Sequence, residues 1–139
     1  MRTTLIALVL LVSMPALADG VVGRWKTVDD KTHQTESIMR VWEQDGRLYG
    51  AIERLIGWPD NHVCDRCSGD KKDKPMKGLV IFWGLTQDGK GWDHGQIMDP
   101  KDGKVYRCKI ELDGDGALKV RGYMGVAAFG RTQRWFRAD

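Results

Sequence analysis

The chain has 139 residues and a formal net charge of +3 at pH 7, and 42% of its residues are hydrophobic and 29% charged. This balance is typical of one globular domain that buries its own core. The basic residues are scattered, apart from the run Lys71-Lys72-Asp73-Lys74, which we interpret as a solvated loop. We therefore expect no nucleic-acid partner.

Residues 1–18 have the three parts of a secretory signal peptide. Arg2 supplies the positive start, residues 5–12 form an apolar stretch, and Ala18 ends a small-residue cleavage site. The apolar stretch is shorter than the about 20 residues of a membrane-spanning helix. We predict cleavage after Ala18, no membrane span, and a single β-barrel domain over residues 19–139, located in the periplasm or secreted. Cleavage removes one basic residue and no acid, which leaves a net charge of +2.

Eight segments of the mature chain have strand character and are separated by turn signals. They are residues 21–28, 35–43, 47–55, 78–85, 92–98, 104–112, 117–124 and 131–137. Asp45-Gly46 between two of them is a strong hairpin signal, because glycine accepts the positive φ of a tight turn. A long polar loop is expected over residues 56–77.

Alternation of apolar and polar residues indicates sheets with one covered face. In segment 104–112 the apolar positions are Tyr106, Cys108, Ile110 and Leu112. We predict an all-β fold, an antiparallel up-and-down eight-stranded β-barrel, whose interior is either filled by side chains or holds one small ligand. A two-sheet sandwich would give a similar pattern, and residues 79–83, which do not alternate, are also compatible with a short buried helix.

The two ends of the mature chain are predicted to close the barrel. Trp25 lies in the first strand and Arg131 in the last, directly after Gly130. We expect the Arg131 guanidinium to lie on the Trp25 ring in a cation–π contact. Arg134 is at odd spacing from Arg131 and is expected to face the other side of the sheet.

Several motifs spread over the mature chain carry a family resemblance. They are Gly23-Arg24-Trp25, Asp45-Gly46-Arg47-Leu48-Tyr49-Gly50, Cys64-Asp65-Arg66-Cys67, Pro75-Met76-Lys77-Gly78-Leu79, Asp99-Pro100, Gly103-Lys104-Val105-Tyr106 and Gly130-Arg131-Thr132-Gln133. Together they resemble the bacterial secreted family called domain of unknown function 2147. The Gly-x-Trp start is also similar to the calycin pattern of lipocalins and fatty-acid-binding proteins, which implies a small-ligand barrel.

Three cysteines allow more than one pairing. In an oxidising compartment we expect Cys64 and Cys67 to take part in a disulfide, either with each other or with one of them joined to Cys108. A redox-active Cys-x-x-Cys normally begins a helix, and this one lies in a polar loop. Zinc would need four ligands, and His62 with the two loop cysteines supplies three. We therefore predict no metal and no cofactor.

Catalytic motifs are lacking. The sequence has no Gly-x-Ser-x-Gly elbow, and after the signal peptide it has only Ser37 and Ser68. Paired acids such as Asp113 and Asp115 fall in expected turns, where aspartate is favoured for its local hydrogen bonds. We predict no catalytic residues and expect that the protein is not an enzyme.

Six tryptophans in a small domain include candidates for a binding site. Trp58, Trp83 and Trp92 could line a barrel mouth, with an arginine to meet a carboxylate. The candidate ligand-binding residues are Arg40, Arg54, Trp58, Trp83, Trp92, Tyr106 and Met124. The inward-facing set is expected to be Ile38 or Met39, Ile52, Met98, Tyr106, Ile110, Leu118, Val120 and Met124. The alternative is that the aromatic residues pack in a core and the cations are solvated.

These patterns lead to two functional hypotheses. The first is a monomeric, extracytoplasmic, lipocalin-like binding protein for a small apolar or amphipathic ligand such as a fatty acid or lipid. The second is a protein-interaction module of the cell envelope, an inhibitor or stress-related factor, whose barrel is filled by its own side chains. The state of the interior, hollow or filled, distinguishes the two hypotheses.

Overall fold

The computed structural model describes residue 10, residues 20–126 and residues 130–138. The predicted signal peptide therefore lies, apart from Leu10, outside the described residues. Eight strands and one turn of 3₁₀ helix, η1, follow in order. They are β1 (Gly23–Val28), β2 (Thr35–Gln44), β3 (Arg47–Leu55), η1 (Gly69–Lys71), β4 (Val80–Asp88), β5 (Gly91–Met98), β6 (Val105–Asp113), β7 (Ala117–Tyr123) and β8 (Gly130–Arg137).

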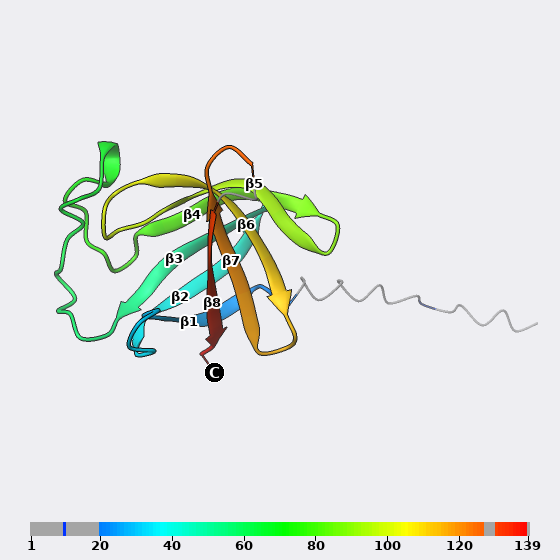
Figure 1. Ribbon diagram of the computed structural model, residues 1–139, viewed down its shortest axis with the longest axis horizontal. Helices are drawn as coiled ribbons and strands as arrows, with labels where there is room; N and C mark the ends of the chain where they lie inside the picture. The colour runs from blue at the N-terminus through cyan, green and yellow to red at the C-terminus, as the bar shows by residue number, and fades with distance from the viewer. Residues whose placement is uncertain (1–9, 11–19, 127–129, 139) are drawn as a thin grey trace, which may run out of the picture.

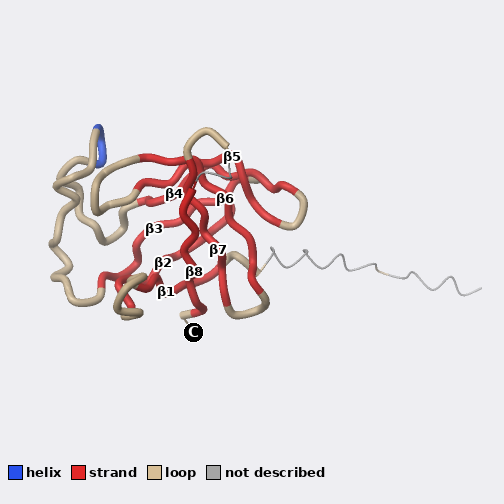
Figure 2. The backbone as a smooth tube through the Cα atoms, viewed as in Figure 1, coloured by secondary structure: helices blue, strands red, loops and turns tan. Residues whose placement is uncertain are grey.

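The strands form one closed barrel in sequence order (Figure 1). Each strand pairs with the next in antiparallel fashion, and β1 pairs with β8. The predicted eight-stranded up-and-down barrel is confirmed, and the sandwich alternative is wrong. Residues 80–83 of the segment without alternation are part of β4 and do not form a helix, and Leu79 directly precedes the strand. Figure 2 shows strands throughout the barrel, with the η1 turn in the long loop. No helix in the described residues is long and apolar enough to span a membrane.

The interior of the barrel is filled by its own side chains. The inward positions of the strands hold large apolar groups with almost no exposed surface, which pack into one cluster. The barrel part of this cluster includes Trp25, Met39, Val41, Leu48, Ile52, Phe82, Leu85, Trp92, Met98, Cys108, Ile110, Leu118, Val120 and Trp135. Most of the predicted inward set is therefore buried. Met124 is not, because it follows the end of β7 and is 67% exposed.

Two glycines let bulky side chains enter the interior. A Cβ on Gly50 would lie 2.2 Å from the Phe82 ring, and one on Gly95 would lie 2.5 Å from the Leu85 side chain. Gly50 and Phe82 are cross-strand partners at a register shift between β3 and β4. Each large side chain thus fills the space that a neighbouring residue leaves empty, as the close packing of protein interiors requires.

The barrel is closed by Trp25 and Arg137. These residues are direct partners on β1 and β8, and the Arg137 guanidinium carbon lies 4.2 Å from the centroid of the Trp25 ring. The Trp25 indole nitrogen donates to the Val21 carbonyl oxygen. The choice of Arg131 was wrong: it lies six residues before Arg137, at the other end of β8, and forms an ion pair with Asp30.

The loop between β3 and β4 packs against one end of the barrel. The Cys64–Cys67 disulfide, one of the predicted pairings, lies in this loop, and both residues are buried in the core cluster. The Cys67 sulfur lies 3.3 Å from the sulfur of Met98 in β5. The disulfide therefore anchors an otherwise polar loop to the barrel core.

Candidate functional site

The predicted ligand-binding residues do not surround one cavity. Trp92 is buried in the barrel interior, whereas Trp58 in the β3–β4 loop is 59% exposed and stacks on His62. Trp83 is half-buried, with its indole nitrogen 3.2 Å from the side-chain oxygen of Gln96. Tyr106 is half-buried, and Met124 lies in an exposed segment after β7. The expectation of a single barrel mouth lined by these residues was wrong.

Arg40 lies on the outer surface of the barrel. Its neighbours Met39 and Val41 are buried in the interior, and strand alternation places Arg40 on the opposite face. On this outer face Arg40 is the direct partner of Ala51 in β3, which in turn pairs with Val80 in β4. This row of side chains crosses three neighbouring strands.

A groove of about 680 Å³ lies on this outer face of β2, β3 and β4. It is lined by Arg40, Trp42, Ala51, Ile52, Glu53, Lys77, Gly78 and Val80. A second hollow of about 330 Å³ shares Lys77, Gly78 and Val80 with it and continues along the β3–β4 loop. The second hollow adds Lys71 and Lys74 to the cations that line the groove. We call the two hollows together the outer groove.

The polar groups of the outer groove are predominantly cationic. The Arg40 guanidinium lies 4.5 Å from the centroid of the Trp42 ring, which stacks on Tyr49. Among the described residues no carboxylate forms an ion pair with Arg40. The carboxylates that line the outer groove are Glu53, which is already paired with Arg24 at 2.6 Å, and Asp70 in the second hollow. An anion in the groove would therefore find a charged partner in Arg40 without breaking an existing ion pair.

Arg54, the other predicted arginine, does not line the outer groove. It lies near the end of β3 and is exposed. Lys77 lines the groove and was not predicted, because the sequence places it in a loop whose path cannot be derived from alternation. Its side-chain nitrogen lies 3.4 Å from an Asp60 oxygen. The sequence does contain a signal for the outward position of Arg40, because Arg40 lies between the apolar residues Met39 and Val41 on a strand.

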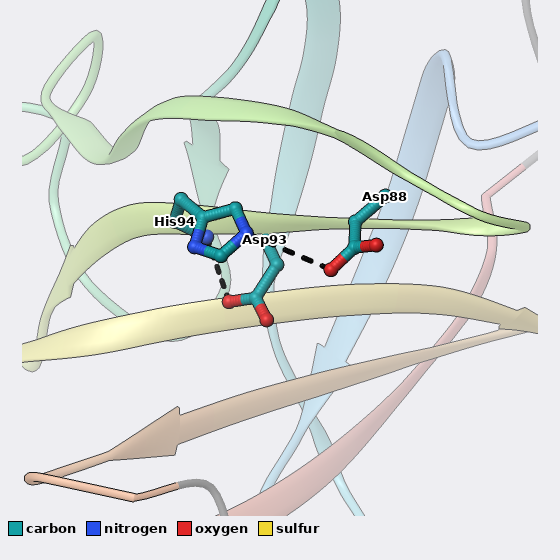
Figure 3. Close-up of side chains that lie close together, drawn as sticks. All are labelled: Asp88, Asp93 and His94. Atoms are coloured by element: carbon teal, nitrogen blue, oxygen red, sulfur yellow. Dashed lines mark hydrogen bonds and ion pairs between the residues drawn. The ribbon is translucent and has the colours of Figure 1, made fainter.

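A second cluster of polar side chains lies at the β4–β5 hairpin (Figure 3). Asp88 and Asp93 each contribute a carboxylate oxygen and His94 contributes a ring nitrogen, and these three atoms lie within 4.8 Å of one another. The His94 Nε2 lies 3.6 Å from Asp88 Oδ2, and the His94 backbone N–H donates to Asp93 Oδ1 at 2.7 Å. These three groups are of the types that bind divalent cations. Sequence spacing alone does not group the three residues, because only the β4–β5 hairpin brings Asp88 next to Asp93 and His94.

Asp93 has a structural role of its own. Its carboxylate is buried, and its Oδ1 accepts a 2.8 Å hydrogen bond from the Tyr123 hydroxyl. Burial raises the pKa of Tyr123, and the hydrogen bond to Asp93 raises it further. Burial also raises the pKa of the Cys108 thiol strongly, with an added contribution from the Asp93 charge. Cys108 is therefore held as an unreactive thiol in the core.

The sequence of this chain matches a known family, and its fold is similar to a solved structure. The family model described as "Uncharacterized protein conserved in bacteria (DUF2147)" matches residues 23–137. The fold is similar to that of a solved structure described as "Protein HP1028 from the human pathogen Helicobacter pylori belongs to the lipocalin family". The TM-score is 0.74 at 17% sequence identity, covering 85% of this chain and 82% of that chain. No curated protein matches this chain. The similarity establishes a lipocalin-like fold.

Proposed function

This chain belongs to the DUF2147 family, and we propose that it is an extracytoplasmic binding protein for a small amphipathic molecule with an anionic group, such as a fatty acid. The observation that carries the proposal is the outer groove, which combines apolar side chains with the cation of Arg40. The groove is a shallow hollow that is open to solvent along the barrel wall. The ligand binds on the outside of the barrel.

The groove matches the two parts of such a ligand. The partly exposed Val80 provides apolar surface between the strands, and the Trp42 ring provides a broad apolar wall. Arg40 presents a planar guanidinium that suits the two oxygens of a carboxylate. Since the Trp42 ring already orients this guanidinium, little side-chain entropy is lost when an anion binds.

Two features support an extracytoplasmic location. The first is the Cys64–Cys67 disulfide, because disulfides persist mainly in oxidising compartments. The second is the signal-peptide pattern of residues 1–18.

The filled interior favours a second candidate function. A barrel whose inward positions are occupied by its own side chains leaves only its outer surface for recognition. A filled interior is what we expect of a protein-interaction module of the cell envelope. In that case the outer groove would bind a side chain of the partner protein. The two functions differ in whether a small molecule alone saturates the groove.

A fluorescence titration tests the proposal. Oleate added below its micelle concentration is expected to quench tryptophan fluorescence saturably, and Trp42→Phe should remove most of that response. Arg40→Ala should weaken binding about tenfold, because a hydrogen bond to a charged group contributes about 1.5 kcal/mol. Arg54→Ala is the matched control, since it removes an exposed arginine from the neighbouring strand and leaves the groove intact.

Two outcomes would overturn the proposal. If Arg40→Ala and Arg54→Ala weaken the quenching equally, the outer groove is not the site. If no fatty acid of a panel with different chain lengths gives saturable quenching, the protein is not a binding protein for this class of molecule. The second result would favour the protein-interaction module.

A further inference from the structure

The outer face of β6, β7 and β8 carries a concentration of positive charge. These strands lie side by side in the barrel, on the part of its wall that does not contribute to the outer groove (Figure 1). The outward positions hold five cations, which are Arg107, Lys109, Lys119, Arg121 and Arg134. The carboxylates on the same face are Glu111 and Asp113. We call this surface the cationic face.

Four of the five cations of this face are placed opposite one another. Lys109 is the direct cross-strand partner of Arg121, and Lys119 is the direct partner of Arg134. Like charges at directly opposed positions destabilise a sheet. Glu111 and Asp113 offset part of this repulsion, through contacts of 4.0 Å to Lys119 and 2.5 Å to Arg134. No described carboxylate forms an ion pair with Lys109.

Exposed apolar side chains border the cationic face at one end. Val105, at the start of β6, is 42% exposed and lies two residues before Arg107. The cross-strand partner of Arg107 is Tyr123, which directly precedes the exposed Met124. Val126, two residues further on, is 59% exposed. Cations on this part of the barrel wall thus adjoin an apolar edge. Such an arrangement suits an interface between water, lipid headgroups and acyl chains.

We propose that the cationic face is a docking surface for an anionic lipid bilayer. The cations contact headgroup phosphates, and Met124 and Val126 enter the boundary between headgroups and acyl chains. Arg107 and Lys109, which form no ion pair with any described carboxylate, can meet headgroup phosphates without breaking an existing ion pair. The binding is peripheral and depends on salt, because the charges are screened over about 8 Å at physiological ionic strength. This proposal is independent of a ligand in the outer groove.

Vesicle sedimentation tests the docking surface. The disulfide-bonded mature protein is mixed with vesicles of phosphatidylcholine alone or with phosphatidylglycerol added. We expect binding to the anionic vesicles that falls as sodium chloride is raised. Lys109→Gln and Arg107→Gln should each lower the partition coefficient about fivefold, which corresponds to about 1 kcal/mol per cation near the membrane. Met124→Ser should weaken the binding that remains at high salt.

Arg54→Gln is the charge-matched control, because it removes one exposed cation from β3, outside this face, and should leave vesicle binding unchanged. Urea denaturation of each variant shows whether folding is retained. We expect Lys109→Gln to be at least as stable as the wild-type protein, since it removes a like-charge pair. A variant that loses binding while keeping stability supports the proposal.

Three results would overturn it. One is equal binding to neutral and anionic vesicles. Another is an equal loss of binding in Lys109→Gln and Arg54→Gln, which would indicate that only net charge matters. The third is binding of a sulfated polysaccharide or a DNA duplex under conditions in which anionic vesicles do not bind. That result would assign the cationic face to a different polyanion.

Discussion

The packing of Phe82 against Gly50 determines whether the barrel interior has room for a ligand. We predict that Gly50→Ala destabilises the protein. Gly50 does not have a positive φ, so alanine introduces no backbone strain there. Any loss of stability would therefore come from the added methyl group itself, which points at the Phe82 ring.

The size of the effect follows from the distances. The new Cβ would lie 2.2, 2.5 and 2.8 Å from three carbon atoms of the Phe82 ring. Carbon atoms in contact are normally separated by about 3.5–4.0 Å, so the ring has to retreat by more than about 1 Å. Phe82 has no exposed surface and packs near Trp135, with 6.1 Å between ring centroids. We expect a loss of about 1–3 kcal/mol, the usual cost of overpacking.

Urea denaturation followed by tryptophan fluorescence measures this loss. Gly116→Ala is the matched control, because the new Cβ would have no heavy atom within 4 Å and Gly116 has no positive φ. The double variant Gly50→Ala with Phe82→Leu should recover part of the loss, since the smaller side chain makes room for the methyl group. If Gly50→Ala is as stable as the control, the ring can move into free space. The interior would then be able to hold a ligand, and a filled barrel would be refuted.

Three further predictions concern closure, pH and thiol reactivity. Arg137→Ala should destabilise the protein by about 1–2 kcal/mol, because the contact with the Trp25 ring is lost. Arg131→Ala should cost less than about 1 kcal/mol, because the ion pair of Arg131 with Asp30 is exposed. Urea denaturation measures both losses. Because the pKa of Tyr123 is raised in the folded protein, its neutral hydroxyl contributes to the free energy of unfolding in full below about pH 10. This contribution is lost as the pH rises through the pKa of Tyr123 in the folded protein. Tyr123→Phe should therefore weaken the decrease of stability at alkaline pH. Cys108 should react with a maleimide only in denaturant, and labelling of the native protein would contradict its burial.

The strands could be predicted because local signals determine them. Asp45 and Gly46 adopt positive φ values of 53° and 75°, as expected for a two-residue turn between β2 and β3. Alternation in β6 and β7 identified the buried faces, and Ile110 and Leu118 are fully buried. These signals depend only on neighbours in the sequence. They therefore determine which residues form strands and which side of each strand is buried.

Register between distant strands was not predictable in the same way. Arg131 and Arg137 are six residues apart and have the same parity, so alternation cannot distinguish them as partners of Trp25. Only the register between β1 and β8 determines which arginine is the partner of Trp25. Because no short turn joins these two strands, the sequence does not reveal that register. Register shifts add to the difficulty, since one lies between Ile38 and Met39, two residues before Arg40. The place of Arg40 in the candidate site depended on this geometry.

Because side chains fill the barrel interior, the charged groups available for recognition lie on the outer surface. An inward cation would have to lose its water of hydration without a partner, which costs several kcal/mol. Arg40 and Lys109 both occupy outward positions, and each remains without a carboxylate partner among the described residues. The outer groove and the cationic face lie on different strands, so one can be changed without the other. If Arg40→Ala weakens oleate binding and spares vesicle binding, and Lys109→Gln has the reverse effect, the two faces act as separate sites on one rigid core.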